Sequence, residues 1–499
     1  MIVYKNYVDG AWTDTIAGES LETENPYTRK PWATIARSGP DDVDAAVEAA
    51  SQAFEGGPWS TMTASARGNL LWRMGDLLEA NADRLAALET NDNGRAITDV
   101  KNAVVYLSGF FRYFGGLADK IEGAVPPLEK QNHFNYTRHE PYGVVAALIP
   151  WNAPLLLVIW KLAPGLAAGN TFVIKPHELA SVATLELAAL FTEAGFPPGV
   201  VNVITGTGAE VGEHLVAHPK VAKIAFTGGD VAGRAVYMAA ASGFKPVTLE
   251  LGGKSPAIVF DDADLDNAAS SVVMGMFTAS GQACIACSRI LVHETVYGVF
   301  LNKIEGLLSN VKIGDPSDPE TDIGPMGGRP QYDNAMKYLQ IAKEEGATVV
   351  AGGVASKRPG CVGGYFIEPT ILGDVTNNMR VAREEIFGPV LSVVRVKSYE
   401  EGVSLINSGA FGNGTAIFTN DGGAAKKFVT DIQVGMVGVN VPIPVPMAYF
   451  SFGGWKHSLF GDSRAHGEEG FRFFTRQKVV TSRWLDPSHG GLNLGFPQN

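Results

Sequence analysis

Two of the chain's three cysteines, Cys284 and Cys287, stand three residues apart in the stretch GQACIACSR. This spacing occurs in half of a zinc ribbon, in a redox pair, and where a nucleophilic thiol has a cysteine neighbour. No second CxxC motif accompanies it and Cys361 is isolated, so a metal site is the least favoured of the three. A redox pair usually begins a helix in a small domain, and this chain has 499 residues. The sequence therefore favours a nucleophile over a redox pair.

A thiol nucleophile needs a base and a donor for the developing oxyanion, and two other stretches supply candidates. Glu250, in LELGGKSP, stands where a strand-like run ends and has the chemistry of a general base. It is equally a solvated acid beside a turn. Asn152, in IPWNAP, is a neutral donor held between two prolines, although an asparagine there often only caps a turn. Each stretch taken alone leaves the structural alternative open.

A third group of residues suits a nucleotide. In FTGGDVAG, glycines follow an apolar run and fit a strand-to-helix turn on which a pyrophosphate rests. The spacing from Gly228 to Gly233 departs from GxGxxG, so this signal is weak. Lys175 and Glu178 end another strand-like run, VIKPHE, where they could hold the ribose hydroxyls of a nucleotide or be ordinary surface charges.

The elements that must position these residues have an α/β pattern. After an opening hairpin, apolar residues recur at helical spacing behind acidic residues at Asp41, so the first hundred residues are expected to be mostly helical. Further on, short apolar runs such as GVVAALI and TFVIKP alternate with helical segments, which predicts a parallel sheet covered on both faces. A second such series follows Gly253. Two domains with a small-molecule cleft between them are expected.

Composition argues against several classes of function. Forty Lys and Arg against 52 Asp and Glu give a net charge of −12, which disfavours binding to nucleic acid or anionic membranes. The most apolar stretch, 144–160, contains two prolines and ends at Lys161, so it is not expected to span a membrane. Three cysteines are too few to stabilise a chain of this length by disulfide bonds, so a reducing compartment is expected. The first residues of the chain also lack a signal-peptide pattern. A cytoplasmic protein is expected.

The motifs PWN, VIKPxE, FTGG, ELGGKSP, GQxC, EEIFGP and SFGGWK follow one another in the order seen in the aldehyde dehydrogenase superfamily. The chain resembles this superfamily from about Asn25 to Trp484. The resemblance implies an α/β fold with a Rossmann-type nucleotide-binding domain, an α/β catalytic domain that carries the thiol, and a small β oligomerisation element. It implies an NAD-binding domain at residues 1–120 and 142–253, a catalytic domain at 254–455, and an oligomerisation region at 121–141 and 476–499.

The resemblance also implies roles for individual residues. Cys284 would attack the aldehyde carbon, Asn152 and the Cys284 backbone N–H would hold the oxyanion, and Glu250 would activate the water that releases the acid. Lys161 and Glu468 match positions of a proton route. The implied contacts to NAD come from Ile149, Pro150, Trp151, Lys175, Glu178, Gly208, Phe226, Thr227, Gly228, Gly229, Leu251, Glu385 and Phe387.

The sequence leaves two alternatives for the cofactor, NAD or NADP, and two for the product, a free acid or an acyl-CoA. A carboxylate at Glu178 accepts hydrogen bonds from a 2′-hydroxyl and repels a 2′-phosphate, so NAD is predicted over NADP. The C-terminal segment also resembles methylmalonate-semialdehyde dehydrogenases, which form acyl-CoA. Those enzymes lack the glutamate that Glu250 supplies and carry arginine where this chain has Ala283, so release of the free acid is predicted. A non-enzymatic relative is disfavoured by the presence of Cys284 and Asn152 together with Glu250.

An apolar aldehyde is the expected substrate. Aromatic residues are candidates for the wall of its access tunnel: Trp151, Trp160, Phe110, Phe114 and Phe452. Phe110 and Phe114 equally fit the buried face of a helix. Cys287 is interpreted as a packing residue, or at most as a thiol that traps Cys284 on oxidation. No metal is expected, and such enzymes are usually homodimers or homotetramers.

Overall fold

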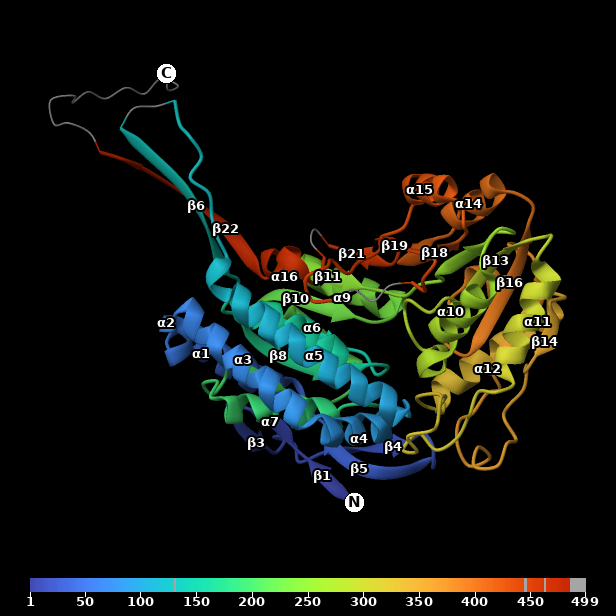
Figure 1. Ribbon diagram of the computed structural model, residues 1–499. Helices are drawn as coiled ribbons and strands as arrows, with labels where there is room; N and C mark the ends of the chain where they lie inside the picture. Colours follow the sequence, from blue (N-terminus) through green and yellow to red (C-terminus); the bar gives the residue numbers. More distant parts are fainter. Residues whose placement is uncertain (130–131, 444–446, 462–463, 485–499) are drawn as a thin grey trace.

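The computed structural model describes residues 1–129, 132–443, 447–461 and 464–484. Within these residues, the first large sheet has eight strands in the order β21-β11-β10-β7-β8-β9-β2-β3 (Figure 1). Its strands are β2 (Asn6–Val8), β3 (Ala11–Thr13), β7 (Val144–Ile149), β8 (Thr171–Pro176), β9 (Val201–Val203), β10 (Val221–Thr227), β11 (Val247–Glu250) and β21 (Leu459–Phe460). Strands β7 to β11 run parallel, as the alternation of apolar runs and helices predicted.

Helices cover both faces of this sheet. They are α1 (Pro40–Glu55), α2 (Pro58–Thr61), α3 (Ala64–Ala80), α4 (Ala82–Asn93), α5 (Ile97–Leu117), α6 (Pro154–Ala167), α7 (Val182–Ala194), α8 (Glu213–Ala217) and α9 (Asp230–Ser242). Alternate residues of β7 point to opposite faces: Val145 and Ala147 join the core with α3 and α5 to α7, whereas Ala146 and Leu148 join the core with α1 and α8. None of the helices in the described part of the chain combines the length and apolarity needed to cross a lipid bilayer.

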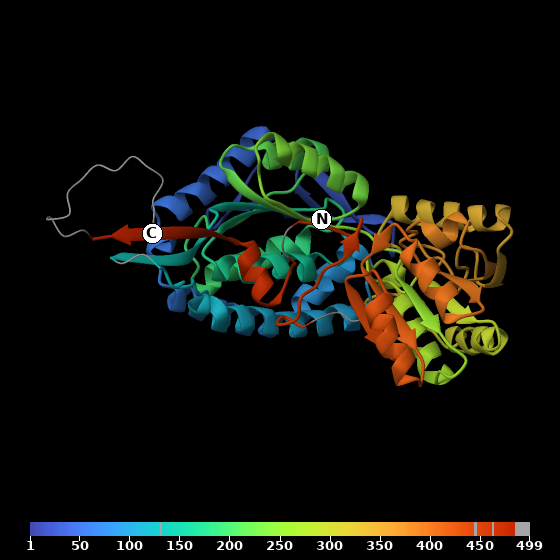
Figure 2. The same ribbon diagram turned by 90° about the horizontal axis from the view of Figure 1, so that it is seen from above.

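A second α/β unit lies at the other end of the molecule from the chain's projecting ribbon (Figure 2). In the described residues its sheet has seven strands in the order β14-β15-β16-β13-β12-β18-β19. These are β12 (Pro256–Val259), β13 (Arg289–His293), β14 (Thr348–Ala351), β15 (Thr370–Val375), β16 (Val390–Val396), β18 (Gly414–Phe418) and β19 (Met436–Val439). Its main helices are α10 (Leu265–Phe277), α11 (Tyr297–Leu308), α12 (Arg329–Glu344), α14 (Tyr399–Asn407) and α15 (Gly422–Asp431). All strands but β14 pair in parallel.

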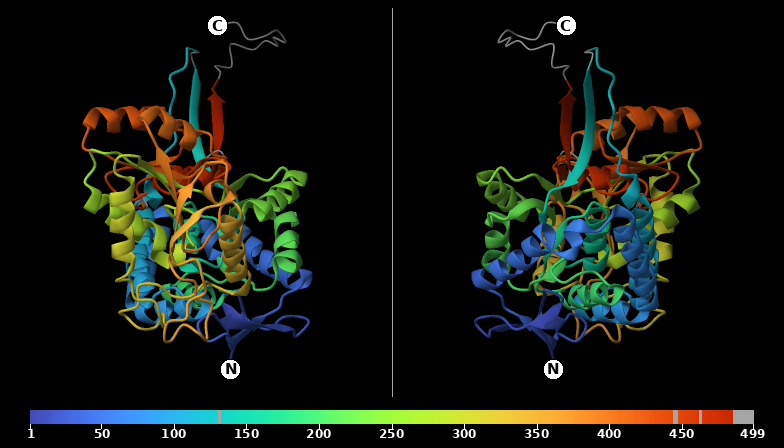
Figure 3. Two further views of the ribbon diagram at one scale, coloured as in Figure 1. Left: turned by 90° about the vertical axis from the view of Figure 1, so that its right-hand side faces the viewer. Right: turned by 90° about the vertical axis from the view of Figure 1, so that its left-hand side faces the viewer.

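The projecting ribbon consists of two strands that are far apart in the sequence. β6 (His133–Pro141) pairs antiparallel with β22 (Thr475–Arg483), and the pair extends away from the body (Figure 3). Phe134 and Val479 on it are 51% and 62% exposed. The β element that the resemblance implied for this part of the chain is therefore present. Residues 485–499 of the predicted oligomerisation region lie outside the described residues.

Smaller pairings complete the fold. β1 (Ile2–Tyr4), β4 (Ser20–Asn25) and β5 (Lys30–Ala36) form a three-stranded sheet, and β17 (Phe411–Gly412) pairs with β20 (Trp455–Lys456).

The predicted α/β class is confirmed. The strands of the second sheet fall inside the predicted range 254–455, while the domain boundaries themselves stay predictions.

The first sheet brings several of the predicted site residues to one edge. Parallel strands end on the same side, and their register sets which terminal residues are neighbours. Thr227, the last residue of β10, lies beside Glu250, the last residue of β11, and Leu148 of β7 lies beside Lys175 of β8. Because ligands in such sheets bind beyond the carboxyl ends of the strands, this edge is where a site is expected.

Candidate active site

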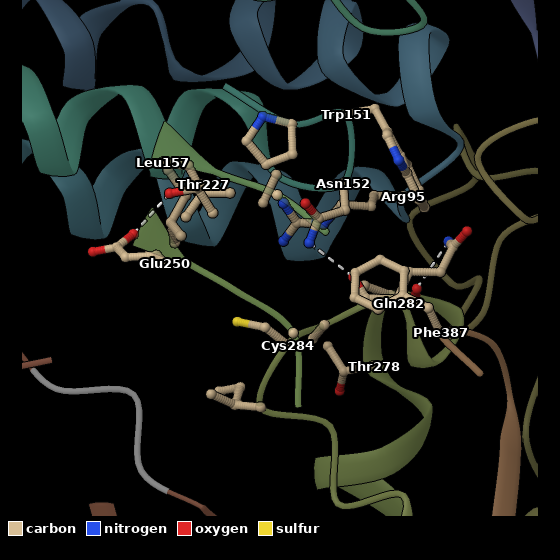
Figure 4. Close-up of a pocket in the computed structure, with 18 of the residues that line it drawn as sticks. Arg95, Trp151, Asn152, Leu157, Thr227, Glu250, Thr278, Gln282, Cys284 and Phe387 are labelled. Atoms are coloured by element: carbon tan, nitrogen blue, oxygen red, sulfur yellow. Dashed lines mark hydrogen bonds between the residues drawn. The ribbon is translucent and has the colours of Figure 1, made fainter. Parts of the chain in front are cut away.

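A cavity of about 530 Å³ lies between this edge and the second α/β unit (Figure 4). It is lined by segments that follow β7, β10 and β11, by segments 274–285, 385–387 and 442–443 of the other unit, and by Phe452. The predicted site residues that line it are Pro150, Trp151, Asn152, Trp160, Thr227, Gly228, Gly229, Glu250, Leu251, Cys284, Glu385, Phe387 and Phe452. Residues from six of the seven motifs thus meet at one place.

Cys284 lies in the turn that follows α10 and lines the cavity. Its backbone carbonyl accepts a hydrogen bond from Asn413 Nδ2 at 3.3 Å. Burial raises the pKa of the Cys284 thiol to about 12, and the nearby carboxylates of Glu385 and Glu250 act in the same direction because they repel a thiolate. The resting thiol is therefore protonated, and it needs a proton acceptor before it can act as a nucleophile.

Cys287 has a different environment. It is 2% exposed, belongs to the hydrophobic core of the second unit, and does not line the cavity. Its backbone N–H donates to the carbonyl of Gly275 at 3.0 Å. The three cysteines, all in described segments, are free thiols. This placement agrees with the interpretation of Cys287 as a packing residue.

Glu250 belongs to a buried polar network with Thr227 and Lys161. The Thr227 hydroxyl donates to Glu250 Oε2 at 2.8 Å, and Lys161 Nζ donates to the same hydroxyl at 2.6 Å. Lys161 Nζ is also 3.5 Å from Glu250 Oε2. Burial lowers the pKa of Lys161, and the Glu250 carboxylate opposes that shift. Lys161 does not line the cavity itself, so it acts on the cavity through Thr227 and Glu250.

Asn152 is held on the opposite side of the cavity from Glu250 (Figure 4). Its side-chain Nδ2 donates to the backbone carbonyl of Gln282 at 2.9 Å, two residues before the thiol. A primary amide has two N–H groups, so this bond orients the amide and leaves one N–H for another acceptor. Gln282 is in turn fixed by its Oε1, which accepts the Gly327 N–H at 2.9 Å.

The residues predicted to contact the cofactor fall into two groups. Lys175 and Glu178 lie outside the cavity at the end of β8, where Lys175 Nζ is 3.3 Å from Glu178 Oε2. Burial would raise the pKa of Glu178, but the neighbouring His177 and Lys175 hold it below its ordinary value. Glu178 is therefore an anion that points along the sheet edge. Ile149, Phe226 and Gly208 likewise do not line the cavity.

Glu385 and Phe387 form the second group and reach the cavity from the other unit. Glu385 Oε1 accepts the Gly253 N–H at 2.8 Å, and a Cβ at Gly252 would overlap its carboxylate, so glycine is required there. Burial raises the pKa of Glu385 to about 7. Phe387 has a left-handed backbone (φ 58°) and packs edge-on against Trp151 at 5.6 Å between ring centroids.

The structure does not bring Glu468 to the cavity. Its side chain is 71% exposed in the first turn of α16 (Gly467–Phe473), where it pairs with Arg472 at 3.5 Å. The buried side chain of this segment is instead His466, which packs against Trp160 with ring centroids 4.4 Å apart. The expected proton route through Glu468 therefore has no structural support.

Some of the aromatic residues predicted to form the access tunnel line the cavity, and others lie in the hydrophobic core of the first unit. Trp160 and Phe452 line the cavity with ring centroids 4.8 Å apart, and Trp151 lines it near Phe387. Phe110 and Phe114 are 1% and 0% exposed, belong to the core of the first unit, and do not line the cavity. Phe110 and Phe114 therefore pack on the buried face of a helix, which was the alternative interpretation of their spacing.

Sequence reasoning missed a polar group on the cavity wall. Arg95 and Asp99 both line it, and Arg95 Nη2 donates to Asp99 Oδ2 at 2.7 Å while its Nη1 donates to Glu89 Oε1 at 2.8 Å. One cation thus faces two carboxylates. The only available signal was a dense polar run, NDNGR, at the end of a helical pattern.

A thiol, an amide donor and a carboxylate meet at one cavity, beside the edge of a parallel sheet where nucleotide cofactors bind. This arrangement is typical of a nucleotide-dependent enzyme. A model of the aldehyde dehydrogenase family matches residues 12–480. The chain belongs to the aldehyde dehydrogenase family, as its motifs predicted.

Individual relatives are similar along nearly their whole length. Aldehyde dehydrogenase 1 of Tanacetum cinerariifolium is 42% identical, over 96% of this chain and 96% of its own. Retinaldehyde dehydrogenase 3 of Homo sapiens is 42% identical, over 97% and 93%. Among solved structures, the NAD⁺ complex of aldehyde dehydrogenase from Bacillus cereus has a TM-score of 0.93 at 37% identity, covering 96% of each chain. Betaine aldehyde dehydrogenase from Staphylococcus aureus, also with NAD⁺, has a TM-score of 0.95 at 33% identity, covering 100% of each.

Proposed function

We propose that the protein oxidises an aldehyde to the free carboxylic acid with NAD as the hydride acceptor, through a thioester on Cys284. The observation that carries this proposal is the convergence of Cys284, Asn152 and Glu250 on one cavity. These three groups supply the nucleophile, the oxyanion donor and the base that the two halves of the reaction need.

In the first half, the Cys284 thiol gives its proton to solvent and its sulfur attacks the aldehyde carbon, whose carbonyl oxygen becomes the oxyanion. The free N–H of the Asn152 amide and the Cys284 backbone N–H donate to the oxyanion of the resulting hemithioacetal. NAD supplies the hydride acceptor, and departure of the hydride leaves a thioester. In the second half, Glu250 takes a proton from water, which attacks the thioester and releases the acid and the thiol. Lys161 and Thr227 hold the Glu250 carboxylate in place.

The donor set fits a dinucleotide with a free 2′-hydroxyl. Glu178 and Lys175 lie at the sheet edge where the adenosine ribose would bind, and Glu385 would hold the nicotinamide ribose. The turn at Gly228 and Gly229 precedes α9, whose N-terminus suits a pyrophosphate. An anionic Glu178 accepts hydrogen bonds from a hydroxyl and repels a phosphate, which supports NAD over NADP.

The cavity wall favours a neutral, apolar aldehyde. Arg95 is the one arginine or lysine among the described residues that line the cavity, and its charge is matched by two carboxylates. An anionic substrate would find no free cation there, whereas Trp160 and Phe452 offer apolar surface. The acyl-CoA-forming alternative is disfavoured because Glu250 lines the same cavity as Cys284, where its carboxylate would activate water.

Assembly and location follow from the surface. Phe134 and Val479 on the β6–β22 ribbon are exposed, and pairing with further copies would cover them, which supports a homodimer or homotetramer. Three free thiols support a reducing compartment, and we place the protein in the cytoplasm.

The test follows NADH formation by the purified enzyme with neutral aliphatic, aromatic and anionic aldehydes, with and without CoA, and identifies each product. We expect free acid from the neutral aldehydes regardless of CoA, and none from a Cys284→Ala variant. Acyl-CoA as the main product would overturn the assignment of Glu250.

A further inference from the structure

The last turns of α4 carry polar side chains that point into the interior of the protein. Glu89, Asp92 and Asn93 are 1%, 0% and 1% exposed. Burying such groups is costly unless each finds hydrogen-bond partners, so their contacts indicate what they are there to hold. Asp92 Oδ2 accepts the N–H of Val182 at 2.9 Å, at the start of α7. The contacts of the other two go to the active-site loop.

Asn93 hydrogen-bonds to the backbone of the loop from Trp151 to Leu155, which carries Asn152. Its Nδ2 donates to the carbonyl of Trp151 at 3.1 Å and to the carbonyl of Asn152 at 3.3 Å. Its Oδ1 accepts the Arg95 N–H at 3.1 Å, which fixes the amide in the orientation that points the donor at the loop. Two consecutive carbonyls of a half-buried loop therefore accept hydrogen bonds from one side-chain nitrogen.

Glu89 hydrogen-bonds to the other end of the same loop, at Leu155. Its Oε2 accepts the Leu155 N–H at 3.0 Å, in the first turn of α6, where a carboxylate is favoured by the unpaired N–H groups of a helix start. Its Oε1 is occupied by Arg95. The segment from Trp151 to Leu155 is thus tied to α4 at both ends.

We propose that Asn93 is a positioning residue that sets the place of the Asn152 amide beside Cys284. The inference rests on the proposed function, since it assumes that Asn152 holds the oxyanion. Asn152 is anchored on two sides: its carbonyl by Asn93, and its Nδ2 by the Gln282 carbonyl. Loss of the backbone anchor leaves the side-chain anchor to hold the loop alone, and the donor drifts from the oxyanion.

The experiment compares Asn93→Ala and Asn93→Asp with Asn91→Ala. Asn91 is on the same helix, and its Oδ1 accepts from Asn25 Nδ2 at 3.0 Å, away from the loop. Asn93→Asp keeps the acceptor for the Arg95 N–H but replaces the donor with a carboxylate oxygen that repels the two carbonyls, whereas Asn93→Ala removes both the donor and the acceptor. Each variant is assayed with NAD and an aldehyde for kcat/KM, for NAD affinity, and for alkylation of Cys284 by iodoacetamide.

Both Asn93 variants are expected to lose about 10- to 100-fold in kcat/KM, because small displacements of a catalytic group have effects of this size. The alkylation rate, which does not use the oxyanion donor, stays at the wild-type value, and NAD affinity falls less than kcat/KM because Trp151 is only one of the predicted NAD contacts. Asn91→Ala keeps wild-type kcat/KM. Wild-type kcat/KM in Asn93→Asp overturns the proposal. Parallel loss of NAD affinity and alkylation also overturns it, since that pattern reports general damage.

A double-mutant cycle separates this inference from the function on which it rests. In an Asn152→Ala background, Asn93→Ala is expected to cost nothing more, because the group it positions is gone. Independent, multiplying losses overturn the positioning role and leave the oxyanion role of Asn152 intact. If Asn152→Ala alone keeps wild-type kcat/KM, the oxyanion assignment in the proposed function is wrong.

Discussion

Replacing Glu250 with glutamine should separate the two halves of the reaction. Glutamine keeps the size of the side chain and still accepts the Thr227 hydroxyl, which lies 2.8 Å from Glu250 Oε2, but it cannot take a proton from water. A positioned general base contributes roughly 10²- to 10⁴-fold to a rate. At about 1.4 kcal/mol per factor of ten, this is roughly 3–5 kcal/mol of activation free energy. Because the hydride leaves before water attacks, only hydrolysis slows.

The substitution also removes the carboxylate that lies 3.5 Å from the buried Lys161 Nζ. Burial already lowers the pKa of Lys161, and loss of the carboxylate lets it fall further. Lys161 then releases its proton at a lower pH instead of remaining a buried, unpaired cation. The variant should therefore fold, with the Thr227 hydroxyl still bridging the two side chains.

Rapid mixing of Glu250→Gln with NAD and an aldehyde provides the assay. We expect a burst of NADH equal to the active-site concentration, then steady turnover lowered about 10²- to 10⁴-fold. Acid quenching during the slow phase should recover Cys284 carrying the acyl group. Turnover at the wild-type rate would show that another base activates water. Slow turnover without a burst would show that Glu250 acts before the hydride leaves.

Three further predictions concern charge. Glu385→Gln removes an anion that raises the pKa of Cys284, so iodoacetamide should alkylate the thiol faster than in the wild type. The difference should be largest above pH about 7 and vanish below it, where Glu385 itself is protonated. Glu178→Gln should raise the KM for NAD and shift the NADP-to-NAD preference about tenfold toward NADP, since one charge-assisted hydrogen bond and one repulsion are lost. Arg95→Leu leaves two carboxylates without their cation and should cost about 3–5 kcal/mol in urea unfolding, whereas Arg329→Ala, which removes an exposed ion pair, should cost at most about 1 kcal/mol.

Those parts of the site that lie at strand ends could be predicted from the sequence. Thr227 and Glu250 each follow an apolar run, and parallel strands bring their last residues to one edge, where the register makes these two direct neighbours. Cys284 was predicted to be the nucleophile because no second CxxC motif accompanies its stretch. Candidates for a base and for an oxyanion donor also occur elsewhere in the sequence. In each case a local pattern carried the information.

The polar support of the site could not be predicted, because it depends on contacts between distant segments. Asn93 and Asn152 are 59 positions apart, and nothing in the run NDNGR says that its side chains turn inward. Glu468 is a different case, because its role was assigned by resemblance of sequence and stays a prediction. In the structure the Glu468 side chain is exposed, whereas His466, two residues earlier, is buried.

The question raised by two cysteines three residues apart is settled by proton chemistry. Burial raises the pKa of both thiols to about 12, so at neutral pH neither is ionised to a useful degree. Thiol–disulfide exchange and metal binding both require thiolates, which disfavours the redox pair and the metal site alike. A nucleophile faces the same requirement, but Cys284 lines the cavity, from which its proton can pass to solvent. Cys287 lies in the hydrophobic core of the second unit and does not line the cavity, so the geometry favours Cys284 as the nucleophile.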